Sequence, residues 1–402
     1  MTPRLAIVTT HPVQYYAPWF RHLAASSGLD VRVFYLWDFG VADRTDRGFG
    51  QKVRWDIPLL DGYESEFVPN ASADPGTHHF AGIDNPTLSE RLDAFAPSAT
   101  LCIGYNHRTF LRLLRGRGRR REPLLLRGDS HRLVRPAGVR AWAKRQVLTR
   151  LFRRFAGFLY VGRANREYYR IHGVPEDRLF FSPHAVDNDR FTGARPDAER
   201  AAREWKRELG ISPARPVVLF AGKFEPKKRP GDLLEAFGRA RLPVATLLFV
   251  GDGPLAGELR DRAAGVPDVH FAPFQNQSQM PRTYAAGDLL VLPSYGPSET
   301  WGLCVNEAMC LGRPAVVSSH VGCGPDLVTD GETGRVFPAG DVDALAGVLR
   351  AACTDRDARL RWAVAATRRV REYSYAAATR GLAECLARLP AAASHVGAHP
   401  SA

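Results

Sequence analysis

Short, uninterrupted apolar runs alternate with helical stretches along nearly the whole chain. Each run is a few residues long, and polar residues do not alternate with the apolar ones inside it. Continuous runs of this kind are typical of strands buried on both faces of a parallel sheet. With helical connections between them, they predict an α/β architecture with two doubly wound domains. The expected strands are Leu5–Val8, Val31–Trp37, Thr100–Ile103, Leu124–Leu126, Phe158–Val161 and Leu179–Ser182 in the first half, and Val217–Ala221, Thr246–Val250, Val269–Ala272, Leu289–Leu292 and Ala315–Ser318 in the second.

The predicted boundary between the two domains lies near Phe191–Pro216. Thr192–Pro196 contains glycine and proline and predicts a linker, and Ala201–Leu209 predicts a polar helix. A last helix, within about 373–389, is expected to pack back on the first domain. The expected units are a first domain of residues 1–191, a linker and helix over 192–215, a second domain of 216–372, and a disordered tail, 390–402, with little apolar content.

The composition is that of an ordinary globular protein, with 45% hydrophobic and 24% charged residues among 402. This balance excludes a disordered or fibrous chain, and no stretch approaches the roughly 20 apolar residues that a membrane-spanning helix needs. The N-terminus lacks the long apolar core of a secretory signal, so we expect a cytoplasmic protein. The six cysteines show no metal-like spacing and are expected to be free thiols.

The net charge of +13 comes from one segment. Arg108–Arg154 holds 16 basic residues and only two acids, Glu122 and Asp129, whereas the other 355 residues are nearly neutral. Such a concentration of charge indicates an anionic partner: a membrane surface, a nucleic acid or a phosphorylated substrate. No helix-turn-helix, zinc or aromatic-platform motif accompanies it, so nucleic acid is not expected.

A candidate anion site follows the strand Leu289–Leu292. The loop Pro293–Thr300 leads into a helix that we expect to begin near Trp301. The backbone N–H groups of Thr300–Leu303 would then point outward at the positive end of that helix. Glu299 lies just before the helix, and Glu307 lies about two turns into it, where it can flank the same cleft.

The spacing of Glu299 and Glu307, followed by Ala-Met, resembles the signature of retaining GT-B glycosyltransferases of family 4. Three further stretches are similar to motifs of that family: Gly222–Lys228, Val250–Pro254 and Ser182–Asp187. The resemblance covers about residues 5–385 and is sharper after residue 216. It implies a GT-B fold, in which two Rossmann-like domains of doubly wound parallel sheet face a central cleft.

The resemblance also implies roles for residues around that cleft. Lys223 and Lys228 would place positive charge on the diphosphate of a nucleotide-sugar donor, Glu307 would accept hydrogen bonds from the ribose, and Glu299 would hold the donor sugar. Lys223 stands where the family usually has arginine, so a single point charge replaces a bidentate group. The residues expected to bind the donor are Gly222, Lys223, Lys228, Gly251, Gly253, Thr300, Trp301, Gly302, Leu303 and Glu307, joined by His11 and Gln14 from the first domain.

The first half offers several polar residues at strand ends. His11, Gln14 and Tyr15 follow the first strand, and Tyr105–His107 follow a later one. The family often places a catalytic-site histidine after the strand that here reads Pro123–Leu126. That position falls on Asp129, with His131 two residues on, and the sequence leaves open which of them faces the sugar. The expected catalytic set is Glu299, Lys228, Asp129 and His131.

Val139–Phe155 has apolar residues at helical spacing, with basic residues largely on its other faces. This pattern fits an amphipathic helix packed on its own domain, or an interfacial helix that docks on anionic lipid. The second interpretation would place the protein peripherally on the inner face of the membrane.

The sequence thus predicts a retaining, metal-independent glycosyltransferase that needs no cofactor. It would move a sugar from a nucleoside-diphosphate sugar, UDP- or GDP-linked, to a hydroxyl acceptor, with a lipid-linked or cell-surface glycan precursor as one option. Two other classes stay open: a nucleotide-sugar epimerase of the same fold, and a non-catalytic protein that binds membrane or polyanion through Arg108–Arg154.

Overall fold

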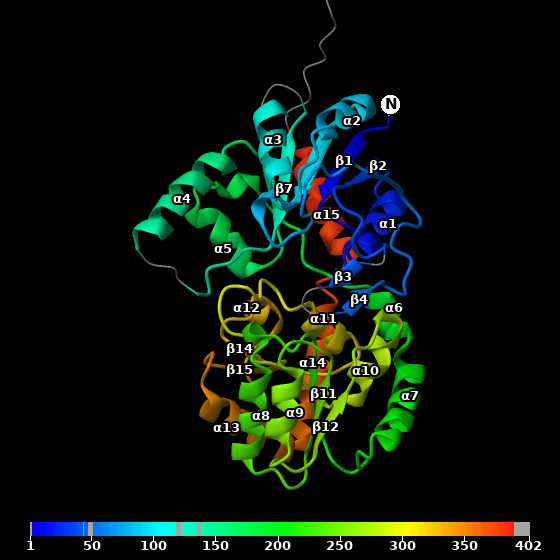
Figure 1. Cartoon of the computed structure of the whole chain (residues 1–402), viewed down its shortest axis with the longest axis vertical. Helices are drawn as coiled ribbons and strands as arrows, with labels where there is room; N and C mark the ends of the chain where they lie inside the picture. Colours follow the sequence, from blue (N-terminus) through cyan, green and yellow to red (C-terminus); the bar gives the residue numbers. More distant parts are fainter. Residues whose placement is uncertain (1, 43, 47–50, 118–121, 135–137, 390–402) are drawn as a thin grey trace, which may run out of the picture.

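The computed structural model describes residues 2–389 except 43, 47–50, 118–121 and 135–137. The tail that we expect over residues 390–402 lies outside the described residues. The chain forms two layered α/β units, one above the other in Figure 1, and each is built on its own parallel sheet.

The first unit contains a seven-stranded sheet in the order β5-β2-β1-β6-β7-β8-β9, with every neighbouring pair parallel. Apolar side chains from α2 to α5 cover one face of this sheet, and side chains from α1 and α15 cover the other. The strands are β1 Arg4–Thr9, β2 Asp30–Tyr35, β5 Glu64–Phe67, β6 Ala99–Ile103, β7 Leu124–Gly128, β8 Gly157–Tyr160 and β9 Leu179–Phe181; the helices are α1 Ala17–Ser26, α2 Leu88–Phe95, α3 Arg108–Arg117, α4 Val139–Phe152, α5 Arg163–Ile171 and α15 Tyr375–Ala387, with short 3₁₀ turns η1 Phe80–Gly82 and η2 Glu176–Arg178.

The second unit contains a six-stranded parallel sheet in the order β12-β11-β10-β13-β14-β15. Side chains from α8, α9 and α13 pack on one face, and side chains from α7, α10 and α11 pack on the other. The strands are β10 Val217–Ala221, β11 Thr246–Val250, β12 Val269–Ala272, β13 Leu289–Leu292, β14 Ala315–Ser318 and β15 Gly334–Phe337; the helices are α6 Asn188–Gly193, α7 Arg195–Glu208, α8 Pro230–Ala240, α9 Ala256–Ala263, α10 Met280–Ala286, α11 Leu303–Cys310, α12 Gly324–Leu327, α13 Val342–Thr354 and α14 Arg356–Val370, with 3₁₀ turns η3 Pro226–Lys228 and η4 Gln277–Gln279.

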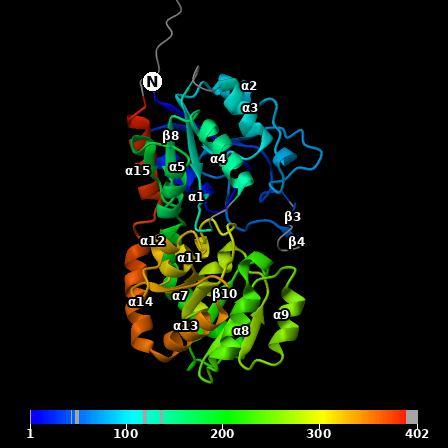
Figure 2. The same cartoon turned by 90° about the vertical axis from the view of Figure 1, so that its left-hand side faces the viewer.

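The chain crosses between the two units twice. It leaves the first unit after β9 and returns between α14 and α15, which run as one column along the side of the molecule in Figure 2. The two crossings are bound to each other, because the side-chain amide of Asn188 donates hydrogen bonds to the carbonyls of Val370 and Tyr373, at 3.3 and 3.2 Å.

The predicted α/β class and all eleven predicted strands are confirmed. The strands that the apolar pattern does not reveal lie at sheet edges or in a separate two-stranded ribbon, where burial on both faces is not required. Thus β5 reads ESEF and β15 reads GRVF. The ribbon pairs β3 Arg44–Asp46 with β4 Gln51–Val53.

Several predicted helix bounds were wrong. Thr192–Pro196 is not an irregular linker, because α6 runs to Gly193 and α7 begins at Arg195, with Pro196 in its first turn, where proline is tolerated. The helix predicted over Val139–Phe155 ends at Phe152 as α4. Among the described residues no helix is both long enough and apolar enough to span a bilayer.

The last helix, α15, packs closely against the edge of the first sheet. A Cβ built on Gly381 would lie 1.8 Å from the carbonyl oxygen of Phe181 in β9. The hydroxyl of Ser182 also donates to the carbonyl of Ala378 at 3.0 Å. The contact of α15 with the first unit therefore depends on a residue without a side chain.

Replacing Gly381 with alanine is expected to destabilise the protein by about 2–4 kcal/mol, because α15 must move away from β9. Gly347→Ala in α13 is the matched control, since a Cβ there meets nothing within 4 Å. The control should be neutral or slightly stabilising, because alanine favours helix by about 1 kcal/mol over glycine. Urea unfolding of the three proteins measures the difference, and equal stabilities of the two variants would contradict the predicted clash.

Candidate functional site

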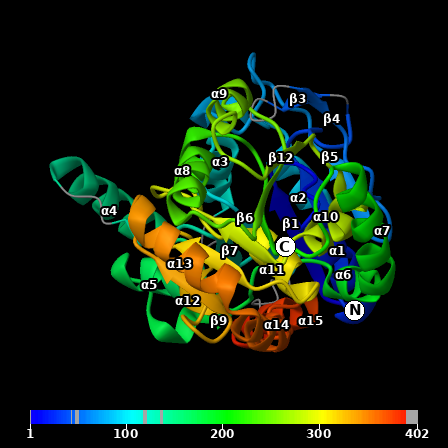
Figure 3. The same cartoon turned by 90° about the horizontal axis from the view of Figure 1, so that it is seen from below.

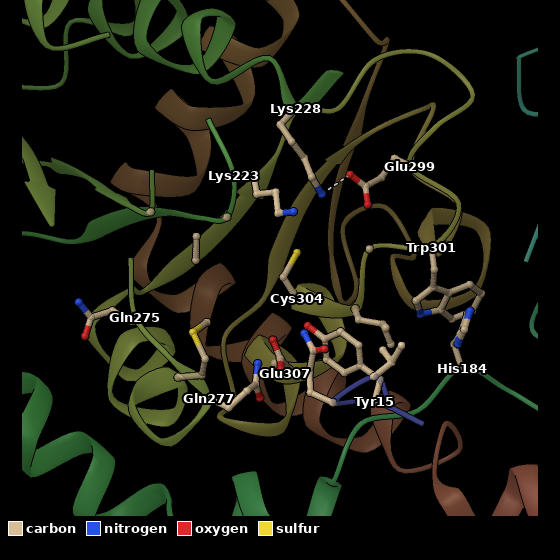
Figure 4. A pocket seen from close by; sticks show the side chains of 18 of the residues that line it. Tyr15, His184, Lys223, Lys228, Gln275, Gln277, Glu299, Trp301, Cys304 and Glu307 are labelled. Atoms are coloured by element: carbon tan, nitrogen blue, oxygen red, sulfur yellow. Dashed lines mark hydrogen bonds and ion pairs between the residues drawn. The ribbon is translucent and has the colours of Figure 1, made fainter. Parts of the chain in front are cut away.

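A cavity of about 480 Å³ lies between the carboxyl ends of the two sheets (Figure 4). The second unit supplies most of its lining from the loops that follow β10, β11, β12 and β13, and the first unit closes it with the segment after β1 and with Asp129 and His184. Ligands of open α/β sheets bind at this end of the strands, so the cavity is the candidate functional site.

Two glycine turns bring the ends of β10 and β11 into direct backbone contact. The amide of Gly222 donates to the carbonyl of Val250 at 3.0 Å. A Cβ on Gly251 would lie 2.0 Å from the carbonyl oxygen of Gly222, and the φ of Gly251 is +145°. Only glycine fits there. Both turns line the cavity, and Lys223 extends into it from the first of them.

A buried ion pair joins the loops after β10 and β13. The ammonium of Lys228 contacts the Glu299 carboxylate, and their side chains are only 19% and 10% exposed. The hydroxyl of Ser294 donates to the same carboxylate at 2.8 Å. Burial opposes both charges, but the attraction prevails: the pKa of Glu299 is lowered and that of Lys228 is raised. Both groups are therefore ionised at neutral pH, and both line the cavity.

The loop after Glu299 differs from the prediction in one detail. Helix α11 begins at Leu303 rather than near Trp301, because Gly302 at its N-cap has a φ of +103° and Trp301 is buried beneath the loop. The indole of Trp301 donates to Asn306 at 2.8 Å. Thr300–Leu303 nevertheless all line the cavity.

Glu307 lies on the second turn of α11 and is 1% exposed. Its Oε2 accepts a hydrogen bond of 2.5 Å from the Tyr284 hydroxyl. Its Oε1 is buried and has no hydrogen-bond partner among the described residues. Burial raises the pKa of Glu307 to about 7, although the Tyr284 hydrogen bond acts in the opposite direction. A buried acceptor without a partner costs free energy, so the site is ready to receive a hydroxyl donor.

Asp129 is the first-unit carboxylate that faces the cavity. It accepts a hydrogen bond of 2.7 Å from the Thr300 hydroxyl, and the Nε2 of His184 lies 3.6 Å from the same oxygen. Burial alone would raise its pKa, but interactions with His184 and Thr300 lower the pKa to about 2. Asp129 therefore carries a negative charge at neutral pH.

His131 occupies a different position from Asp129. Its Nδ1 accepts a hydrogen bond from the Leu133 amide at 3.2 Å, so its Nε2 carries the proton and donates to the carbonyl of Glu299 at 3.0 Å. Both ring nitrogens are used, and His131 is not among the residues that line the cavity. The structure thus brings Asp129, rather than His131, to the cavity, while His131 holds the loop that carries Glu299.

Of the remaining predicted residues, some line the cavity and others do not. Gln14 lines the cavity with Tyr15. His11 does not line it, and its ring packs against Trp37 and Phe39. Gly253 packs against the backbone of Phe224 beside the turn instead of facing the cavity. The lining also lacks Tyr105, Asn106 and His107.

Sequence reasoning missed several cavity residues. Tyr284, which binds Glu307, lies in a helix whose pattern gave no functional signal. Trp55 and Phe274 approach each other from opposite units, with ring centroids 6.4 Å apart, and both line the cavity. Ser294, which was also missed, does not line the cavity but donates to Glu299 from five residues earlier in the same loop.

Among the described residues, one group has the spacing of metal ligands: Asp74, His78 and His79. None of the three lines the cavity. The group lies before η1 on the first unit, so it is separate from the candidate site.

The raised pKa of Glu307 predicts a specific dependence of stability on pH. A carboxyl whose pKa rises from 4.5 to about 7 on folding stabilises the folded state while protonated, and this contribution is lost as pH rises through 7. Between about pH 4.5 and 8 the wild type should lose about 3 kcal/mol relative to Glu307→Gln. Urea unfolding across this range measures the effect.

The control for that experiment is Glu258→Gln, at an exposed position in α9. Its stability should run parallel to that of the wild type at every pH. If the Glu307→Gln curve also ran parallel to the wild type, Glu307 would have an ordinary pKa.

Comparison with known proteins relates the second unit to one family. Residues 201–369 match the family model for glycosyl transferases group 1. Sulfoquinovosyl transferase SQD2 of Arabidopsis thaliana is 36% identical over 170 residues, which are 42% of this chain and 32% of the relative. A D-inositol 3-phosphate glycosyltransferase of Nocardia farcinica is 32% identical over 231 residues, 54% of this chain and 49% of the relative. The chain thus matches about a third to a half of the length of these relatives.

Solved structures resemble the whole chain. HepE (Alr3699) of Anabaena, solved in complex with UDP, has a TM-score of 0.71 at 17% identity, covering 97% of this chain and 100% of the other. WaaG, a glycosyltransferase involved in lipopolysaccharide biosynthesis, has a TM-score of 0.67 at 17% identity, covering 96% and 100%. At this identity the likeness concerns the fold. The chain therefore has the GT-B fold, and its second unit matches the group 1 glycosyl transferases in sequence.

Proposed function

We propose that this protein is a glycosyltransferase that moves a sugar from a nucleoside-diphosphate sugar to a hydroxyl acceptor. One observation carries the proposal: a single cavity is lined by three lysines, Lys223, Lys227 and Lys228, and by a buried carboxyl, Glu307, with an unpartnered oxygen. Cations suit a diphosphate, and a buried acceptor suits a ribose hydroxyl. The family match of residues 201–369 supports the same class of reaction.

The donor would lie across the ends of the second sheet. Its ribose would donate a hydrogen bond to the free Oε1 of Glu307, and its diphosphate would lie near Lys223, Lys228 and the amides before α11. The base would lie toward Phe274, after β12. HepE was solved with UDP and with UDP-glucose, which favours a uridine nucleotide over GDP.

The sugar would lie near Glu299 and Asp129, which face the cavity from opposite units. Both carboxylates are ionised, so each can accept hydrogen bonds from sugar hydroxyls and stabilise developing positive charge at the anomeric carbon. Because Glu299 is held by Lys228 and Ser294, we assign it to positioning the sugar rather than to nucleophilic attack.

The reaction that we propose conserves the anomeric configuration. The acceptor oxygen attacks the anomeric carbon on the face from which the diphosphate leaves, the bond between that carbon and the phosphate oxygen breaks, and the acceptor proton passes to the departing phosphate. Lys223, Lys228 and the loop amides would stabilise the negative charge of the leaving group, a role that needs no metal ion.

Contact with a membrane remains a proposal that rests on α4, which projects from the body of the molecule in Figures 1 and 3. Its Val139, Trp142 and Val147 are 63–80% exposed, and exposed basic residues such as Arg150 lie on the same helix. This combination suits a peripheral contact with anionic lipid and an acceptor at the inner face of a membrane. Other parts of Arg108–Arg154, namely residues 118–121 and 135–137, lie outside the described residues.

Nucleotide binding is the first prediction of this proposal. A nucleoside diphosphate at 100 times its dissociation constant should stabilise the protein by about 2.7 kcal/mol, measured as a thermal shift. The shift should be selective for one base, reduced in Lys223→Met and lost in Glu307→Ala. Lys206→Met, in α7, should respond like the wild type. No shift with any nucleotide in well-folded protein would remove the proposed donor site.

Slow cleavage of the bound donor by water provides a second prediction. The sugar released from the best-binding sugar nucleotide should first appear with the anomeric configuration of the donor, with or without a metal chelator. Proton NMR of the anomeric position measures this before mutarotation. An inverted product would contradict retention, loss of turnover with chelator would contradict metal independence, and conversion into another sugar nucleotide would identify an epimerase.

A further inference from the structure

A second cavity, of about 590 Å³, lies beneath α4 and outside the donor cavity. Residues of α4, of α5 and of the loop after β7 line it, and Pro297 approaches from the second unit. The described lining contains four cationic side chains and two histidines but no aspartate or glutamate. These six residues are His131, Arg132, Arg140, Lys144, Arg145 and His172. We call this space the α4 cavity.

Within the described part of the chain, no carboxylate forms an ion pair with the cations of the α4 cavity. Among the described residues, Arg132, Arg140 and Lys144 form no ion pair, and Arg145 binds only the carbonyl of Ile171, through Nε at 3.1 Å. Neighbouring arginines on α5 behave differently: Arg166 and Arg170 both pair with Glu176.

The positive charges of the α4 cavity also act on His172, which lines it. Burial lowers the pKa of His172, and Arg132, Arg145 and Lys144 lower it further. Like charges held together at one cavity repel one another, so the arrangement favours an anion that neutralises them. The N-terminus of α4, at Gly138, also opens on the cavity and adds the positive end of a 14-residue helix.

Aromatic surface accompanies the charge. The Trp142 ring lines the cavity and is 63% exposed, and Tyr168 lies on the opposite helix, with its hydroxyl 3.0 Å from that of Tyr105. Exposed tryptophan beside cations can hold the apolar or sugar body of a ligand whose anionic group binds the basic residues.

The α4 cavity adjoins the sugar end of the donor cavity. Asp129 lines the donor cavity and His131, two residues later, lines the α4 cavity. The wall between them contains the hydrogen bond from His131 to the carbonyl of Glu299. A molecule bound beneath α4 therefore lies next to the residues that we assign to the transferred sugar.

We propose that the acceptor carries a phosphate group, which binds in the α4 cavity to Arg132, Arg140 and Lys144 while a hydroxyl of the acceptor reaches the donor sugar. The identification of the ligand as an acceptor rests on the proposed glycosyltransferase function. The phosphate site itself is inferred from the residues that line the α4 cavity. A soluble phosphate ester and a lipid headgroup share this chemistry.

The test is calorimetric titration of the whole protein with glycerol 3-phosphate, in the presence of saturating UDP. Arg140→Gln/Lys144→Gln removes two charges that line the cavity, and Arg150→Gln/Arg153→Gln removes two charges at the C-terminal end of α4, in its last turn and at its C-cap. All four side chains are exposed. The first double variant should bind glycerol 3-phosphate about tenfold more weakly than the wild type. The second should bind it as the wild type does, and both should bind UDP unchanged.

The same three proteins are then sedimented with phosphatidylcholine vesicles that contain phosphatidylglycerol, and with vesicles that lack it. Selective loss of phosphatidylglycerol binding in the first variant supports the site, with a lipid headgroup as the source of the phosphate. Equal losses in both variants, in titration and sedimentation, would overturn the proposal, because the charge of α4 would then act as a diffuse surface.

The two proposals fail separately. If UDP does not bind but glycerol 3-phosphate still discriminates between the two double variants, the donor assignment is wrong and the phosphate site stands. If UDP binds and glycerol 3-phosphate binds neither the wild type nor the variants, and vesicles do not discriminate, the phosphate site is wrong and the donor assignment stands.

Discussion

The buried ion pair between Lys228 and Glu299 is the constraint on which the site depends. Its two side chains come from the loops after β10 and β13, which are neighbours in the second sheet. Removing either partner would leave a charge in a poorly solvated place, at a cost of about 3–5 kcal/mol. The pair therefore fixes both loops, and with them the positions of Lys223 and of the amides that precede α11.

The loop that carries Glu299 is also where the two units meet. The carbonyl of Glu299 accepts a hydrogen bond from His131, and the hydroxyl of the next residue, Thr300, donates to Asp129. The carboxylate of Glu299 is thus held by Lys228 of the second unit, while its backbone carbonyl is held by His131 of the first. At the nucleotide end, Glu307 is held within the second unit by Tyr284, and Gln14 and Tyr15 of the first unit line the same cavity.

The sequence predicted the buried strands because burial on both faces leaves a continuous apolar run, and it missed β5 and β15 because edge strands need no such run. It placed Glu299, Lys228 and Glu307 in one cavity through a motif whose spacing is local. It could not separate Asp129 from His131, because that choice depends on a contact with the other unit. Trp55 was missed for the same reason, because it meets Phe274 of the other unit. Tyr284 was missed because its partner, Glu307, lies on another helix of the same unit, 23 residues away.

The paired crossings of the chain set the kind of motion that the molecule can make. The stretch after β9 and the stretch between α14 and α15 lie side by side, joined by the amide of Asn188. Two adjacent connections constrain the relative motion of the two halves more than one connection would, because a rotation must now be accommodated at both crossings. A single peptide-bond cut after β9 would leave the two halves joined through α15, which is covalently continuous with the second unit and packs on the first sheet.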